Sequence, residues 1–259
     1  MTDTHCHLYS GEFGTDTNAM INRALDAGIN SFFMPAIDSS THTAMLALED
    51  QYPGKCFSMM GLHPCSVKEN YLDELGLLED WLQKRNFAAI GETGLDFYWD
   101  KSYVKEQYAA LEAQTTLAIR YDLPLVLHTR NAMQETIDFI RQYRGSGLKG
   151  IFHCFGGTAA EAGQITEAGF LLGIGGVVTY KKSGLHQVLK EVDLQHIVLE
   201  TDAPYLSPVP YRGKRNESSY LGLVAEKIAE IKGTHVQEVI GVTDSNARKI
   251  FHKSFIQIK

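Results

Sequence analysis

Short apolar runs rich in β-branched and aromatic residues recur along the chain, and most are separated by stretches with helical apolar spacing. The predicted strands cover residues 3–7, 29–36, 56–63, 88–96, 124–130, 150–155, 169–176 and 197–204. Helical spacing is clearest in residues 17–28, 71–85 and 103–122, and Thr158 with Glu161 has the pattern of a capping box. Regular alternation of strands and helices predicts a parallel sheet.

Eight strand–helix units in about 200 residues, with several strands apolar throughout, favour a closed TIM (β/α)8 barrel of the α/β class. A length of 259 residues with 44% hydrophobic residues suits one such domain, spanning residues 1–259. Residues 205–259 are predicted to add a long loop and two or three helices. The alternative is an open Rossmann-like sheet, but no strand is followed by a Gly-x-Gly-x-x-Gly turn, and we assign Gly173–Gly176 a packing role.

Composition narrows the class of protein further. A formal charge of −7 argues against a protein that coats nucleic acid, although an enzyme can still bind phosphate locally. Neither a secretory signal nor an apolar run of about 18 residues is present, so we expect a cytoplasmic protein with no membrane contact. The four cysteines lack Cys-x-x-Cys spacing and are interpreted as reduced structural thiols. No obligate protein partner is evident.

Polar residues gather where the predicted strands end, which is where barrel enzymes carry their functional groups. They are His5, His7, His63, Glu92, Asp96, His128, His153, Glu200 and Asp202. Side chains two apart on a strand share a face, so His5 and His7 converge while Cys6 faces a helix. A hydrophobic core has no use for so many polar groups, and the pattern indicates a metal site.

Six of these residues are the predicted metal ligands. They are His5, His7, Glu92, His128, His153 and Asp202. Six ligands are too many for one tetrahedral catalytic ion, whereas two ions about 3.5–4 Å apart fit the number. We assign His5, His7 and Asp202 to one ion, His128 and His153 to the other, and Glu92 to the bridge. Two divalent ions are expected, and the sequence leaves Zn²⁺, Mg²⁺ and Mn²⁺ open.

The motifs around these residues resemble the TatD family of metal-dependent deoxyribonucleases. They are D-T-H-C-H (3–7), G-L-H-P (61–64), G-E-T-G-L-D (91–96), L-H-T-R (127–130), F-H-C-F-G-G (152–157), E-T-D-A-P-Y-L (200–206) and N-A-R-K-I-F (246–251). The resemblance implies a barrel of the amidohydrolase superfamily, metal ligation by the same six residues, and 3′-to-5′ exonuclease activity on single-stranded DNA. It departs at Ser218, where the family often has proline; this change is expected to loosen the entry into the following helix.

The predicted mechanism is phosphodiester hydrolysis by a hydroxide held between the two ions. Asp202, Glu92 and His63 are the predicted catalytic residues: Glu92 is the bridge, and Asp202 is either the proton acceptor or a ligand only. His63 contacts the scissile phosphate or a transient third ion, or else fixes the turn before Pro64. Glu200 is expected to orient a ligand, and Asp96 does the same or caps a loop.

Single-stranded nucleic acid is the expected substrate and partner: DNA in the first place, with RNA as the alternative. Arg130, Arg215 and Tyr205 are predicted substrate contacts, within a larger set of loop cations and aromatic residues that includes Tyr98 and Trp99. The alternative for this set is a solvated rim with aromatic packing beneath it. The metal ligands alone do not choose the substrate, so a related metallohydrolase acting on an amide, lactone or phosphoester stays open, as does a non-enzymatic metal-stabilised binding protein.

Overall fold

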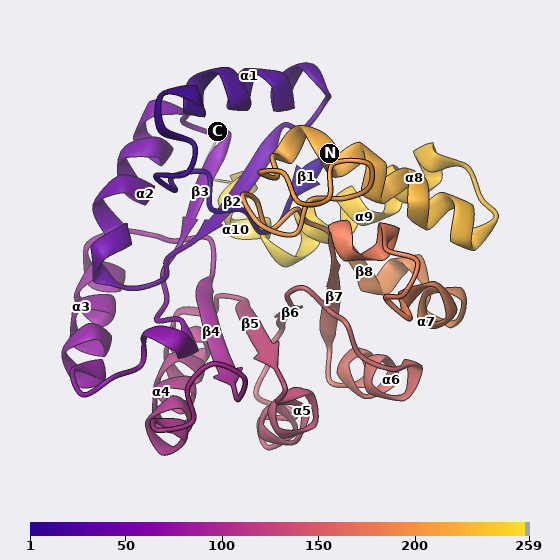
Figure 1. Ribbon diagram of the computed structural model, residues 1–259. Helices are drawn as coiled ribbons and strands as arrows, with labels where there is room; N and C mark the ends of the chain where they lie inside the picture. The colour runs from indigo at the N-terminus through magenta and orange to yellow at the C-terminus, as the bar shows by residue number, and fades with distance from the viewer. Residues whose placement is uncertain (257–259) are drawn as a thin grey trace.

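A computed structural model describes residues 1–256, and its strands form the inner layer of the fold (Figure 1). The strands are β1 (Thr2–Asp3), β2 (Ser31–Pro35), β3 (Cys56–Met59), β4 (Ile90–Asp96), β5 (Leu125–Arg130), β6 (Gly150–Phe152), β7 (Phe170–Ile174) and β8 (Ile197–Leu199). All paired strands are parallel, in the orders β1-β2-β3 and β4-β5-β6-β7-β8.

Helices follow the strands and surround them on the outside (Figure 1). They are α1 (Thr17–Asp26), α2 (Ser39–Gln51), α3 (Tyr71–Lys84), α4 (Val104–Tyr121), α5 (Met133–Arg141), α6 (Ala159–Glu167), α7 (Leu185–Glu191), α8 (Leu221–Lys232), α9 (Val236–Ile250) and α10 (His252–Ile256). The capping box predicted at Thr158 and Glu161 is confirmed at the start of α6. The long loop and further helices expected after the last strand are confirmed as well.

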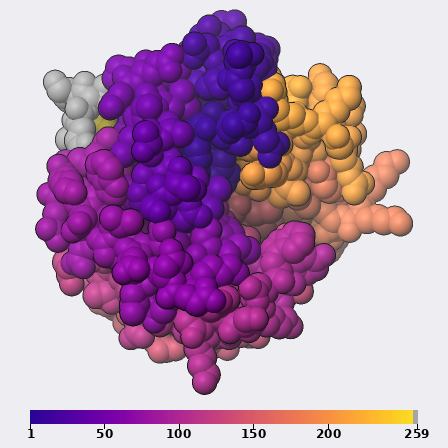
Figure 2. Space-filling model, turned by 60° about the vertical axis from the view of Figure 1, so that its left-hand side comes forward, coloured from indigo at the N-terminus to yellow at the C-terminus, as the bar shows by residue number. Residues whose placement is uncertain are grey.

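Backbone hydrogen bonds join the two sets of strands at both of their edges. Between β3 and β4, the N–H of Gly91 donates to the carbonyl of Met60 at 2.9 Å. Between β8 and β1, the N–H of Thr4 donates to Leu199 at 3.0 Å, and that of Asp202 donates to His5 at 2.9 Å. The indigo N-terminal segment accordingly lies against the orange last third of the chain in Figure 2. The predicted (β/α)8 barrel is confirmed.

Several strands are shorter than predicted. The regular pairing of β1 ends at Asp3 rather than at residue 7, and that of β8 ends at Leu199 rather than at residue 204. The chain beyond β1 keeps single hydrogen bonds to both neighbours, such as Cys6 N–H to the carbonyl of Phe33 at 3.0 Å. Regular pairing stops at this mouth of the barrel, so the polar residues that follow stand on short segments held by single hydrogen bonds rather than on regular strands.

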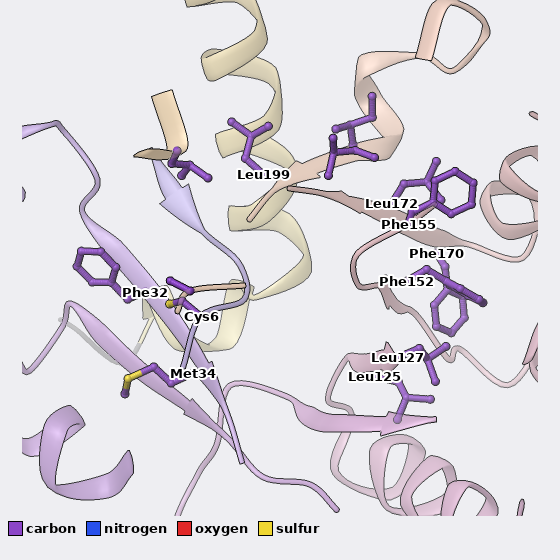
Figure 3. Packing of buried hydrophobic residues seen from close by; sticks show 14 of the residues in the cluster. Cys6, Phe32, Met34, Leu125, Leu127, Phe152, Phe155, Phe170, Leu172 and Leu199 are labelled. Atoms are coloured by element: carbon purple, nitrogen blue, oxygen red, sulfur yellow. The ribbon is translucent and has the colours of Figure 1, made fainter. Parts of the chain in front are cut away.

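Two hydrophobic layers hold the barrel together. The inner cluster includes Phe33, Val126, Ile151 and Val198, and the ring of Phe251 after α9 stacks on Phe33 with centroids 3.8 Å apart. The outer cluster fills the space between strands and helices, and Figure 3 shows Cys6 there beside Phe32 and Met34. The predicted outward orientation of Cys6 is confirmed. Within residues 1–256, no helix is long and apolar enough to cross a membrane.

Candidate metal centre

Strand alternation positions most of the predicted ligands at the mouth of the barrel. Val126 and Ile151 face the interior, so His128 and His153, each two residues further on, face the same way. His5 and His7 follow β1 and are almost fully buried, and His153 is buried at 4% exposure. Asp202 follows β8 and lies across the seam from His5. Sequence spacing therefore brings these side chains to one place.

Glu92 reaches the same place through an irregularity that the sequence did not indicate. Ala89 belongs to the inner cluster and Ile90 to the outer one, so strict alternation would turn Glu92 outward. The pairing of β4 with β5 shifts register between Ile90 and Thr93, as in a β-bulge. Beyond this shift, Thr93 faces α4, where its hydroxyl meets Gln114, and Glu92 faces the interior.

The two carboxylate oxygens of Glu92 face two different groups of histidines. Oε2 lies 3.2 Å from Nε2 of His5 and 3.8 Å from Nε2 of His7. Oε1 faces three further imidazoles: Nδ1 of His128 at 3.0 Å, Nε2 of His63 at 3.6 Å and Nε2 of His153 at 3.8 Å. Glu92 thus occupies the middle of the cluster, which is the place the bridging prediction requires.

Asp202 stands beside the first of these groups. Its Oδ1 lies 3.8 Å from Nε2 of His5, 3.6 Å from Nε2 of His7 and 3.7 Å from Nε2 of His153. His153 therefore lies between the two carboxylates rather than on one side only. The rings of His5 and His153 stack with centroids 3.4 Å apart and planes 14° apart, which brings the two groups of histidines into contact.

Burial and charge set the protonation of the cluster. Burial alone would raise the pKa of Glu92, but the surrounding histidines outweigh it and hold that pKa well below its usual range. Burial lowers the pKa of His5 and of His63, so these imidazoles are neutral at pH 7. Burial would also lower the pKa of His153, but three nearby carboxylates raise it to about 10. The ionised carboxylates attract a cation, and an ion that bound Nε2 of His153 would displace the proton that this ring carries.

Tyr9, which the sequence did not single out, fixes the tautomer of His7. The Tyr9 hydroxyl donates its proton to the carbonyl of Pro35 at 2.6 Å, so at 3.0 Å it can only accept from Nδ1–H of His7. The lone pair of neutral His7 is then on Nε2, which faces Glu92 and Asp202. Tyr9 is two residues beyond His7, and this spacing was the available signal.

Glu200 and Asp96 lie behind two of the histidines. Oε1 of Glu200 lies 3.0 Å from Nδ1 of His153 and accepts from the N–H of Cys154 at 2.6 Å. Gly173 leaves room for this carboxylate, since a Cβ there would meet Oε2 of Glu200 at 2.2 Å. Oδ2 of Asp96 lies 2.9 Å from Nε2 of His128. Each acidic side chain stands where it can orient a ring, and Asp96 also caps the following loop by accepting from the N–H groups of Tyr98 and Trp99.

His63 presents a hydrogen-bond donor to the centre rather than a lone pair. Its Nδ1 accepts from the backbone N–H of Cys65 at 3.0 Å, so the neutral ring carries its proton on Nε2, 3.6 Å from Glu92. The same contact caps the short 3-10 helix Pro64–Ser66. The turn-fixing interpretation and the phosphate-contact interpretation are therefore compatible in one side chain.

Asp3 was also missed, and it ties the segments that carry His5 and Asp202. Its fully buried carboxylate accepts from the N–H of Thr201 at 3.0 Å, from the Thr201 hydroxyl at 2.6 Å and from the Ser218 hydroxyl at 2.6 Å. Ser218 thus makes a buried hydrogen bond at the position where the sequence departs from the family pattern. Proline there would supply no hydroxyl.

The predicted substrate residues lie at different distances from the cluster. The ring of Tyr205 is 6.1 Å from that of His7 and is 45% exposed, at the rim of the centre. Arg130 ends β5 and lines a cavity of 740 Å³ that Cys154 also lines. Arg215 lies apart: it pairs with Asp16, and its guanidinium lies 4.8 Å from the ring of Phe13. The structure does not bring Arg215 to the centre.

The donor set fits a divalent ion. Both ring nitrogens of His5 are buried and have no hydrogen-bond partner within residues 1–256, which is unfavourable unless another species binds them. Groups of three potential ligand atoms from the predicted ligands lie within 4.8 Å of one another: His5 with His153 and Asp202, and His5 with His7 and Glu92. Imidazole and carboxylate ligands suit Zn²⁺ and Mn²⁺.

Several known proteins are similar to this chain. The family model described as TatD related DNase matches residues 2–252. The uncharacterized metal-dependent hydrolase YabD of Bacillus subtilis is 33% identical over 96% of this chain and 98% of its own. The 3′-5′ ssDNA/RNA exonuclease TatD of Pantoea ananatis is 30% identical over 97% and 99%. The crystal structure of YjjV, a TatD homolog from Escherichia coli K12, superposes with a TM-score of 0.91 at 28% identity, covering 97% of this chain and 98% of that one.

Proposed function

Because the chain belongs to the TatD related DNase family, whose relatives include metal-dependent hydrolases, we propose that it is a 3′-to-5′ exonuclease acting on single-stranded DNA. Hydrolysis of phosphodiester bonds fits the names of the relatives, two of which are called 3′-5′ ssDNA/RNA exonucleases. The observation that carries the proposal is Glu92, whose two oxygens face two separate groups of histidines.

Two divalent ions are proposed, held by the six predicted ligands. His5, His7 and Asp202 would hold one and His128 and His153 the other, with Glu92 between them. When bound, such ions lower the pKa of water and neutralise charge on the phosphoryl oxygens. Tyr9, Glu200 and Asp96 support this assignment, because each would hold the distal nitrogen of a ligating ring and leave the other for an ion.

Three side chains are proposed to act on the attacking water or on the substrate. Asp202 accepts the proton of the attacking water: its carboxylate lies among the ligands, and the nearby histidines lower its pKa and keep it ionised despite its burial. His63 donates Nε2–H to a phosphoryl oxygen, which its tautomer permits. Arg130 contributes a cation at the cavity that opens beside Cys154, where the strand would enter.

The decisive experiment uses a 5′-labelled single-stranded oligonucleotide with a free 3′-hydroxyl. Wild-type protein supplied with Mg²⁺, Mn²⁺ or Zn²⁺ is expected to shorten it stepwise, whereas a 3′-phosphorylated strand and a circular single strand resist. Glu92→Gln should abolish the shortening, and His235→Ala, an exposed histidine at the start of α9, should leave it unchanged. Absence of shortening with all three metals, together with turnover of a lactone or amide, would replace the nuclease by the related metallohydrolase.

A further inference from the structure

The most exposed large hydrophobic side chain within residues 1–256 belongs to a loop that is hydrogen-bonded to Asp96, a neighbour of the proposed ligand His128. Trp99 is 66% exposed and its neighbour Tyr98 is 52% exposed, in the loop that follows β4. Their rings meet edge to face with centroids 4.9 Å apart. Two large aromatic side chains in water do little for the folded state, because most of their apolar surface stays hydrated. The exposure of both rings indicates a role in binding a ligand.

The backbone beneath these rings is anchored to the centre itself. Oδ1 of Asp96 accepts from the N–H groups of Tyr98 at 2.9 Å and Trp99 at 3.0 Å. The other oxygen of the same carboxylate contacts Nε2 of His128 at 2.9 Å. One carboxylate therefore separates the aromatic loop from a proposed metal ligand, and the rings are exposed without being attached to a loose loop.

Arg130 adds a cation to the same surface. Its guanidinium lies 4.0 Å from the centroid of Tyr98 and 5.2 Å from that of Trp99, and it stands two residues beyond His128 on β5. Within residues 1–256, Arg130 forms no ion pair, so no carboxylate neutralises its guanidinium. Arg130 also lines the 740 Å³ cavity that reaches Cys154, next to His153.

We propose that Tyr98, Trp99 and Arg130 form a stacking subsite for a nucleobase of the substrate, within two nucleotides of the scissile phosphate. This inference rests on the proposed nuclease function and specifies how its substrate binds. A base stacks on the exposed face of Trp99, and Arg130 contacts the adjoining phosphate. The closeness of the subsite to the centre follows from Asp96, which contacts both His128 and the backbone of Trp99. Stacking accepts any base, so the subsite favours unpaired strands over duplex without reading sequence.

Kinetics on the labelled oligonucleotide test the subsite. Trp99→Ala is expected to raise KM on the order of tenfold with a smaller change in kcat, since stacking stabilises bound substrate and transition state alike. Trp99→Phe keeps an aromatic face and should restore most of the loss. Trp81→Phe, which changes the other of the two tryptophans in the chain, should keep wild-type values because Trp81 lies in α3, where its ring meets His42.

A base-deletion series locates the stacked nucleotide. Strands that carry one abasic position at successive sites from the 3′ end are compared with the intact strand for wild type and for Trp99→Ala. The wild type is expected to bind the strand more weakly when the abasic site occupies one of the positions next to the scissile phosphate. Trp99→Ala is expected to bind that strand and the intact strand equally well. Loss only at distant positions, or equal losses in both proteins, would overturn the proposed subsite.

Fluorescence gives a readout that does not depend on turnover. In Trp81→Phe carrying Glu92→Gln, Trp99 is the sole tryptophan, and titration with an oligothymidylate in chelator should quench its emission. Quenching supports stacking. If wild type shortens the strand while Trp99→Ala keeps KM and no quenching occurs, the subsite is wrong and the nuclease stands. If wild type does not shorten it, the nuclease proposal itself fails, and the subsite fails with it.

Discussion

The carboxylate of Asp3 accepts hydrogen bonds from both the backbone N–H and the hydroxyl of Thr201, 198 residues further along the chain. Asp3 is the last residue of β1, and Thr201 directly precedes Asp202. The pair therefore fixes the segments of His5 and Asp202 relative to each other at the barrel seam. Burial raises the pKa of Asp3 to about 7, despite the hydrogen bonds that lower it.

Asp3→Asn should remove a pH dependence of stability from metal-free protein. A carboxyl group whose pKa is about 7 when folded and 3.8 in its ordinary state stabilises the fold fully below pH 3.8 and loses that contribution as pH rises through 7. The melting temperature of wild type in chelator is thus expected to fall relative to Asp3→Asn between pH 5 and 8. If the melting temperatures of the two proteins changed with pH in the same way over that range, Asp3 would not titrate there.

Metal content should follow the assignment of the ligands. Elemental analysis of protein purified without chelator is expected to give two divalent ions per chain, and Glu92→Gln should lose more metal than a change at either end of the cluster. His5→Ala and His128→Ala should each lose mainly one ion, because they face different oxygens of Glu92. His235→Ala is the matched control. One ion in wild type, unchanged by His128→Ala, would contradict the two-ion assignment.

Gly94→Ala should disrupt the centre from within β4. A Cβ at Gly94 would lie 2.1 Å from the carbonyl oxygen of His128, and the backbone φ of +143° is one that other residues rarely adopt. We expect a loss of at least about 2 kcal/mol in unfolding free energy and a loss of metal. Gly76→Ala is the control: Gly76 lies in α3 with nothing within 4 Å, and alanine there should stabilise by about 0.5–1 kcal/mol. Chemical denaturation measures both.

Glu200→Gln should weaken the centre without unfolding the barrel. The neutral amide favours a proton on Nδ1 of His153 less strongly than the carboxylate does, so the orientation that presents Nε2 to the cluster is held less firmly. We expect a loss of about 10- to 100-fold in metal affinity or activity. Glu226→Gln, an exposed change on α8, should have no effect. Full metal affinity in Glu200→Gln would mean that Glu200 only packs against Gly173.

Much of the architecture was readable from the sequence because strands and helices have different apolar periods. The order of the eight strands follows from the alternation of strands and helices along the chain. The inward orientation of His128 and His153 follows from the alternation of side chains along each strand. Both were predicted. Strand ends were predicted too far along for β1 and β8, because the chain stays buried and keeps single hydrogen bonds to its neighbours beyond the point where regular pairing stops. The period of apolar residues indicates which face of a strand is buried, but it does not indicate where regular pairing between two strands ends.

The contacts of the centre were less predictable, because they depend on geometry that side-chain type does not encode. Glu92 was chosen as the bridge, yet strict alternation after Ile90 would have turned it outward, and only the register shift of β4 turns it inward. The tautomers of His7 and His63 depend on Tyr9 and on the N–H of Cys65, which are single hydrogen bonds. Arg215 is charged and close in sequence to the last strand, but it pairs with Asp16.

The seam between β1 and β8 also determines when the molecule becomes active during its synthesis. A ribosome releases His5 and His7 first, whereas Glu200, Asp202 and Thr201 emerge only after most of the barrel has been translated. Until then the first two histidines lack their carboxylate neighbours across the seam, and Asp3 lacks the groups that hold it. A nascent chain tethered beside its own messenger RNA would therefore carry no complete centre, and the proposed nuclease activity would arise only on release of the last strand.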